Sequence, residues 1–304
     1  MNECRALSAE EWAEFEPVFD KAGYHNPDEV ARFVDTRLDK IYDVFLLDEK
    51  LVLKKEDRDK EKYDRFFAGC DFMVPPILDR FQMKDACWVT MPYINGTDAR
   101  SCSCEDAARV GTELAKIQSH YLNCGGNPET GSDVCKRHFE RHTQRFWNKV
   151  RAYFPAYENV FLFVQERFFS APRSLVHDDL LPINVLLDGE NVWLIDWTYA
   201  EILPYFLDLA RFAFVTDQKD ERYISDEAAR AFLDAYYAEM SQNPVFGMDK
   251  KEFQRDVAVS AFCQYVMFVF YKDAETAVDS ADYQALKKIL EYLECEMDSG
   301  TARI

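Results

Sequence analysis

The segment SLVHDDLLPINVLLDGENVWLIDWTYAE holds one His, two Asn and six carboxylates among apolar residues. Asp178 and Asp179 stand side by side after His177, and adjacent carboxylates repel each other. Asn184 and Asp196 fall within apolar runs, where a buried acid needs a partner or a metal. These spacings indicate that the polar side chains serve one site.

The same segment predicts a β-hairpin, because NVLLD and NVWLID flank the turn DGEN. If Leu187 pairs with Val192, Asn184 stands opposite Ile195. Asn184 and Asp196 then lie one residue step apart at the same end of the ladder. Two oxygen ligands there can hold Mg²⁺, which takes one or two protein oxygens together with phosphates and water.

The chain contains the pattern His177-x-Asp179-x₄-Asn184, and Asp196 follows twelve residues later. This pattern resembles the catalytic loop and the metal-binding Asp of protein-kinase-like phosphotransferases. Its details resemble the aminoglycoside phosphotransferase and choline kinase branch, in which the metal Asp sits in Ile-Asp-Trp and the loop reads Asp-Leu-x-Pro-x-Asn. The sequence DLARF also resembles the Asp-Leu-Ala that follows the metal Asp in that branch. No Ala-Pro-Glu segment follows, which disfavours a protein kinase.

The pattern along the chain suits such a fold. Ser8 and Glu11 form a predicted capping box at the start of a helix. Residues 41–47 and 51–55 predict a hairpin, and most of the chain after residue 103 has helical periodicity. The resemblance implies an α+β, two-lobed protein-kinase-like fold with a small antiparallel-sheet N-lobe and a larger, mainly helical C-lobe. We place the nucleotide-binding lobe at 1–93 and the lobe with the catalytic loop, metal site and acceptor site at 94–304.

The resemblance implies the following roles. Asp179 is the catalytic residue that accepts or orients the proton of the acceptor hydroxyl. Asn184 and Asp196 hold Mg²⁺, and ATP or GTP is the phosphoryl donor. His177 organises the loop through hydrogen bonds. Phosphoryl transfer depends on such positioning and on charge neutralisation more than on covalent chemistry.

Four residues of the first 100 are expected to bind the nucleotide. Lys54 ends a strand and meets phosphates, and Glu61 on the following helix holds that Lys. Lys55 is the competing choice. The resemblance also implies that the Pro92 carbonyl accepts from the adenine and that the Ile94 N–H donates to it.

Two departures from the family pattern stand out. Asp178 occupies the position where the family usually has Gly. The segment FVDTRLDKIYDV, ahead of the Lys54 strand, contains no Gly for a phosphate-covering loop, and Thr36 and Arg37 are the candidate substitutes. A catalytically inactive, kinase-like binding protein is therefore an alternative.

The net charge of −19 disfavours free nucleic acid as a partner and favours a cationic small molecule. Asp178 and Glu201 are candidate acceptor contacts. We expect a hydroxyl acceptor, with an aminoglycoside-like antibiotic favoured, which implies antibiotic resistance. The alternative within the family is a choline, amino-alcohol or sugar kinase.

Neither a signal peptide nor a membrane-length apolar run is apparent, and the nine cysteines are scattered. These features predict a cytoplasmic protein with free thiols and no membrane partner, as a monomer or weak dimer.

Cysteine and histidine residues also cluster between residues 120 and 142. Cys135, His138 and His142 lie near zinc-ligand spacing, but their order matches no two-Cys, two-His finger, so we favour a loop and helix with scattered His. The basic helix expected at 136–151 is interpreted as a solvated face, with an anionic partner as the alternative.

Overall fold

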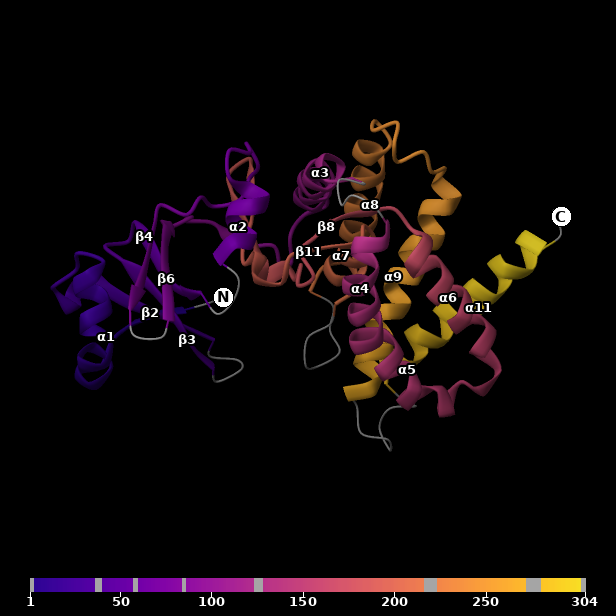
Figure 1. The fold of residues 1–304 in the computed structure, drawn as a ribbon, viewed down its shortest axis with the longest axis horizontal. Helices are drawn as coiled ribbons and strands as arrows, with labels where there is room; N and C mark the ends of the chain where they lie inside the picture. The colour runs from indigo at the N-terminus through magenta and orange to yellow at the C-terminus, as the bar shows by residue number, and fades with distance from the viewer. Residues whose placement is uncertain are drawn as a thin grey trace. The chain divides into compact units, whose positions relative to one another are not determined.

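The computed structural model describes residues 3–35, 40–56, 60–83, 86–122, 128–215, 223–271 and 280–301. The chain divides into two compact units, drawn together in Figure 1. The strand-rich unit comprises Met1–Asp98 and Val185–Thr198, and the helical unit comprises Ala99–Asn184 and Tyr199–Ile304.

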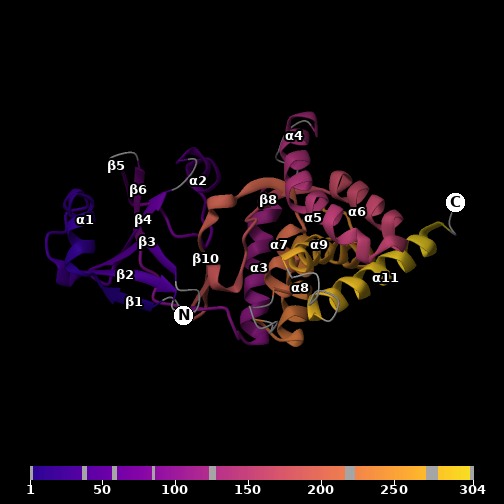
Figure 2. The same cartoon turned by 90° about the horizontal axis from the view of Figure 1, so that it is seen from below.

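A six-stranded antiparallel sheet forms the centre of the strand-rich unit, with the order β1-β2-β3-β4-β6-β5 (Figure 2). Its strands are β1 (Glu3–Ala6), β2 (Val30–Asp35), β3 (Lys40–Leu47), β4 (Leu51–Glu56), β5 (Asp79–Met83) and β6 (Ala86–Pro92). The predicted hairpin is confirmed as β3 and β4. Asp48 and Glu49 both take positive φ in its turn, as a tight hairpin turn with matching twist requires.

Helix α1 (Ala9–Lys21) supplies aromatic side chains to the core of this unit. Ser8 caps it and Glu11 completes the capping box, which confirms the predicted helix start. Phe15 and Phe19 each pack on Phe45 of the sheet with ring centroids 5.0 Å apart. The second helix of this unit is α2 (Lys60–Phe67).

A second sheet of the strand-rich unit contains β10 (Asn191–Leu194), β9 (Val185–Asp188) and β7 (Thr97–Asp98), in that order. Leu187 pairs with Val192, so the predicted register is confirmed over Val185–Asp188 and Asn191–Leu194. The predicted pairing of Asn184 with Ile195 is not present, because Asn184 ends a 3₁₀ turn before β9. The Leu194 N–H donates to the Met73 carbonyl at 2.9 Å, which ties the hairpin to the rest of this unit. Strand β7 was not predicted from the sequence.

The helical unit contains α3 (Cys104–His120), α4 (Pro128–Phe139), α5 (Arg145–Val150), α6 (Glu158–Ser170), α7 (Leu207–Ala213), α8 (Asp226–Met240), α9 (Lys250–Tyr271) and α11 (Ala281–Thr301). A π-helical turn (Glu140–Gln144) joins α4 to α5. Short 3₁₀ turns cover Pro27–Glu29, Arg151–Tyr153, Pro155–Tyr157, Pro182–Asn184 and Trp197–Tyr199.

Helices α3 and α8 pack side by side along much of their length (Figure 1). Gly111 of α3 permits this approach, because a Cβ at that position would overlap the backbone carbonyl of Phe232 on α8. Strands β8 (Arg173–Val176) and β11 (Glu201–Pro204) pair antiparallel in the same unit, with Val176 opposite Glu201. The sequence predicted neither strand.

The compact units differ from the lobes expected at 1–93 and 94–304, since the 185–198 hairpin groups with the strand-rich unit. The assignment of nucleotide binding and acceptor binding to those lobes stays a prediction. Within the described residues, no helix is both long and apolar enough to cross a membrane.

Candidate active site

Residues 177–184 form a loop between β8 and β9, which we call the 177–184 loop. Its first two backbone N–H groups, those of His177 and Asp178, donate to the carboxylate of Asp208 on α7 at 2.8 and 3.0 Å. A buried carboxylate thus accepts from both amides and sets the direction in which the loop leaves the strand.

Asp208 is fully buried and also accepts from the Gln118 amide of α3 at 3.1 Å. Burial raises the pKa of Asp208 to about 7, although the two backbone donors oppose that shift. Sequence reasoning gave Asp208 no role. The signal that pointed to it was the DLARF match, which was used only as support for the family resemblance.

Asp178 has a φ of 64°, in the left-handed region that favours glycine. The usual family Gly at this position is therefore explained by backbone geometry. The Asp178 carboxylate meets Nε2 of His138 on α4 at 2.8 Å. The ring centroids of His138 and His142 lie 4.7 Å apart. Burial lowers the pKa of His142, and the charge of nearby His138 lowers it further.

Asp179 has a different partner from its neighbour. Its Oδ1 accepts from Nη2 of Arg211 at 2.7 Å, and its side chain is 26% exposed. The Asp179 N–H donates to Nδ1 of His177 at 3.3 Å, and its carbonyl accepts from Nδ2 of Asn184 at 2.8 Å. The two adjacent acids therefore have separate partners on different helices, which offsets their mutual repulsion.

The strand-rich unit contains a second constellation. Nζ of Lys54 on β4 lies 2.5 Å from Oδ1 of Asp196, and the Thr198 hydroxyl donates to the same oxygen at 2.6 Å. Lys55 instead meets Asp43, at 3.5 Å. The structure thus pairs Lys54, and not Lys55, with the predicted metal ligand, because successive side chains of a strand point to opposite faces.

Asn184 and Asp196, the two predicted Mg²⁺ ligands, belong to the helical and the strand-rich unit respectively. Each fits Mg²⁺ in its donor chemistry. The Asn184 side chain uses Nδ2 as a donor to Asp179, which leaves its Oδ1 as a ligand oxygen. The Asp196 side chain is 41% exposed, so its carboxylate is accessible to a hard cation.

The remaining predicted residues lie as follows. Pro92 ends β6 opposite Leu51, and Ile94 follows in the connection to β7. Glu61 lies in α2, but its side chain, like residues Thr36 and Arg37, falls outside the described part of the structure. Glu201 begins β11 next to the strand that leads into the 177–184 loop.

The cysteine and histidine cluster is spread over separate contacts. Cys135 is buried in α4 with its Sγ 3.9 Å from the Ile202 carbonyl, and His138 is paired with Asp178. Cys124 lies outside the described residues. Among the residues that the structure describes, no group of three or more His, Cys, Asp or Glu side chains is placed to hold a metal.

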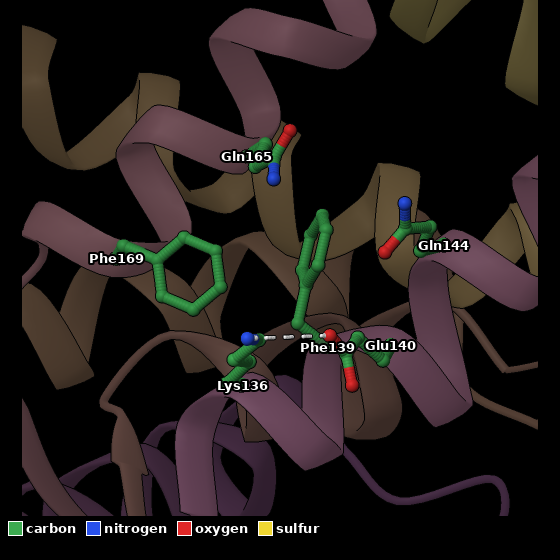
Figure 3. A pocket seen from close by; sticks show the side chains of 6 residues that line it. All are labelled: Lys136, Phe139, Glu140, Gln144, Gln165 and Phe169. Carbon is green, nitrogen blue, oxygen red and sulfur yellow. Dashed lines mark ion pairs between the residues drawn. The ribbon is translucent and has the colours of Figure 1, made fainter. Parts of the chain in front are cut away.

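A pocket of about 270 Å³ lies between α6 and the end of α4 with its π-helical turn (Figure 3). Lys136 and Glu140 form an ion pair of 4.0 Å at its edge. Its lining residues are Lys136, Phe139, Glu140, Gln144, Gln165 and Phe169. No residue assigned a site role from the sequence lines this pocket, so it is separate from the constellation around Asp179.

The model of the phosphotransferase enzyme family matches residues 51–242, which include the Lys54 strand, the 177–184 loop and Asp208. The chain therefore belongs to the phosphotransferase enzyme family, which confirms the family predicted from its motifs.

Protein LicA of Haemophilus influenzae is 25% identical over 204 residues, which cover 58% of this chain and 55% of LicA. The chain thus spans about half the length of that curated relative. The structure of a choline/ethanolamine kinase family protein from Mesorhizobium loti has a TM-score of 0.54 and 17% identity, covering 95% of this chain and 94% of that one. Choline kinase LicA from Streptococcus pneumoniae has a TM-score of 0.52 and 16% identity, covering 94% of this chain and 100% of that one. These similarities confirm the predicted α+β, protein-kinase-like fold.

Proposed function

We propose that the protein is a small-molecule kinase that transfers the γ-phosphoryl group of ATP or GTP to a hydroxyl of a cationic acceptor. The observation that carries this proposal is the 177–184 loop, whose backbone is held by Asp208 and whose Asp179 carboxylate is fixed by Arg211. An acid held in one orientation suits a reaction in which catalysis is mainly positioning.

In this proposal Asp179 accepts the proton of the acceptor hydroxyl as the hydroxyl oxygen attacks the γ-phosphorus. Asn184 and Asp196 hold Mg²⁺, which supplies charge neutralisation at the phosphates. Lys54 contacts Asp196 in the structure. In the proposed reaction its ammonium group binds the phosphates, and Glu61 holds the Lys54 side chain in place. Pro92 and Ile94 provide backbone groups for the nucleotide base.

For the acceptor we propose a small amino alcohol of the choline kind. The support is the sequence similarity to LicA, the likeness of fold to a protein named choline kinase LicA, and the charge of −19. Asp178 and Glu201 stay the candidate contacts for a cationic group. The aminoglycoside-like acceptor that the sequence motifs favoured is the second candidate, because the loop motif fits both branches.

A panel of acceptors tests the proposal. Purified protein is incubated with Mg²⁺ and γ-labelled ATP or GTP, together with choline, ethanolamine, an aminoglycoside or a neutral sugar. We expect label in choline or ethanolamine. Label only in the aminoglycoside would favour the second candidate, and label in protein would indicate a protein kinase. Nucleotide binding with no transfer to any acceptor would contradict the proposal and favour an inactive binding protein.

A further inference from the structure

Helix α7 contacts the 177–184 loop at two points one helical turn apart. Asp208 accepts from the loop backbone, and Arg211 donates to the side chain of Asp179. Residues three apart lie on the same face of a helix, so a single short helix fixes both the path of the loop and the direction of its acid. The first contact shapes the loop backbone, and the second acts on the reactive carboxylate itself.

The guanidinium of Arg211 is itself oriented by a third element. Its Nη1 donates to Oε1 of Gln264 on α9 at 3.4 Å, while its Nη2 reaches Asp179. Gln264 is buried, and the Arg211 side chain is 21% exposed. Within the described residues, the buried Nε of Arg211 has no hydrogen-bond partner. The two hydrogen bonds through Nη1 and Nη2 therefore set the orientation of the guanidinium.

The contact with Arg211 makes the two carboxylate oxygens of Asp179 different. Oδ1 accepts a hydrogen bond from the guanidinium, and no donor among the described residues reaches Oδ2. In the transfer step, the acceptor O–H proton moves to the Asp179 carboxylate and the acceptor oxygen forms a bond to the γ-phosphorus. The bond from that phosphorus to the bridging oxygen breaks, and the nucleoside diphosphate leaves with the electron pair. Only an oxygen aimed at the hydroxyl can take the proton.

We propose that Arg211 is the positioning residue for Asp179, holding Oδ1 so that Oδ2 faces the acceptor hydroxyl. This inference rests on the proposed function and deepens it, since it assigns a residue that the loop motif does not contain. The guanidinium also offsets the repulsion between Asp178 and Asp179, and a neutral side chain at 211 would leave His138 as the partner that offsets it.

The experiment measures choline phosphorylation and acceptor-free hydrolysis of Mg-ATP for wild type, Arg211→Gln, Arg211→Lys, Asp179→Asn and the double variant with Arg211→Gln and Asp179→Asn. We expect Arg211→Gln to lower kcat by about 100-fold with KM values nearly unchanged, because a misplaced reactive group loses about that factor. Arg211→Lys should recover at least part of that loss, since an ammonium can still meet Oδ1.

The double variant separates positioning from a purely structural role. If Arg211 acts through Asp179, Arg211→Gln adds no further loss once Asp179 is Asn. Arg230→Gln is the matched control, because Arg230 is exposed and, within the described residues, contacts only Asp226 and Glu227 of its own helix through polar groups. It should retain wild-type kcat. Thermal unfolding of each variant shows whether it is folded, and Arg211→Met replaces Arg211→Gln if the Gln variant does not fold.

Three results would overturn the inference. Arg211→Gln could retain kcat within about threefold, its loss could be fully additive with that of Asp179→Asn, or the lost activity could match a lost folded fraction. Wild type that transfers no phosphoryl group to water or to any acceptor of the panel would overturn the proposed function and this inference together. Wild-type activity that needs Asp179 but not Arg211 would overturn this inference alone.

Discussion

Asp208 has no access to water, and it accepts hydrogen bonds from two loop amides and from Gln118. Burial holds its pKa at about 7 in the folded chain, against an ordinary value of 3.8. A carboxyl with a raised folded pKa stabilises the folded state fully below its unfolded pKa. That contribution falls as the pH rises from about 4 to about 7 and is constant above.

Asp208→Asn removes this titration and also leaves one loop amide without its acceptor. We therefore expect the variant to be less stable than wild type at pH 4. The difference in unfolding free energy should shrink as the pH rises to about 7 and then level off. Urea denaturation of both proteins from pH 4 to pH 8 measures it, and a difference that does not change with pH would contradict the raised pKa.

Asp178 gives a second prediction at the scale of one residue. Its φ of 64° is free for Gly but costs an Ala residue about 1 kcal/mol. Asp178→Gly and Asp178→Ala both lose the contact with His138, so their comparison isolates the backbone. We expect the Gly variant to be more stable by about 1 kcal/mol in urea denaturation. Equal stabilities of the two variants would contradict the prediction that the left-handed backbone at position 178 favours Gly over Ala.

At the scale of elements, the close approach of α3 and α8 depends on Gly111. A methyl group there overlaps the Phe232 carbonyl, and backbone cannot move aside as a flexible side chain can. We expect Gly111→Ala to lower the unfolding free energy by about 1–3 kcal/mol, the usual range for overpacking. Lys116→Ala on the same helix is the control, because Lys116 is 48% exposed and, in the part of the chain that the structure describes, pairs only with Glu113. Similar stability of wild type and Gly111→Ala would contradict this account of the packing.

Elements with strong local signals could be predicted from the sequence. The Ser8–Glu11 capping box and the register of Leu187 with Val192 are both set by residues a few positions apart, and both are confirmed. Strands β8 and β11 were missed because each has four residues and is paired only through the tertiary fold. The π-helical turn at Glu140–Gln144 has no distinctive sequence signal, so a continuous helix was expected there.

The candidate site shows the same division. The spacing of Asp179 and Asn184 pointed to the loop, since the motif is local. The partners that fix the acids, His138 and Arg211, lie 40 and 32 residues away from them in sequence. Their approach depends on how α4 and α7 pack, and periodicity predicts only that these helices exist. The contact of Asp178 with His138 therefore could not be predicted from residue types.

At the scale of the whole molecule, residues 51–242 match the phosphotransferase enzyme family. Within that region, Asp178 pairs with His138 and Asp179 pairs with Arg211. Lys54 and Asp196 lie in the strand-rich unit, and Asp179 and Asn184 lie in the helical unit. The central claim is that these residues serve one phosphoryl transfer in which Asp179 takes the proton of the acceptor.

The most direct test compares the initial rates of choline phosphorylation by wild type, Asp179→Asn and Asp178→Asn at saturating Mg-ATP. Asn at 179 keeps the shape of the side chain but removes the proton acceptor. We predict a loss in kcat of at least about 100-fold for Asp179→Asn, the usual contribution of a general base, and less than about tenfold for Asp178→Asn. Wild-type turnover in folded Asp179→Asn protein would contradict the claim that Asp179 is the catalytic residue.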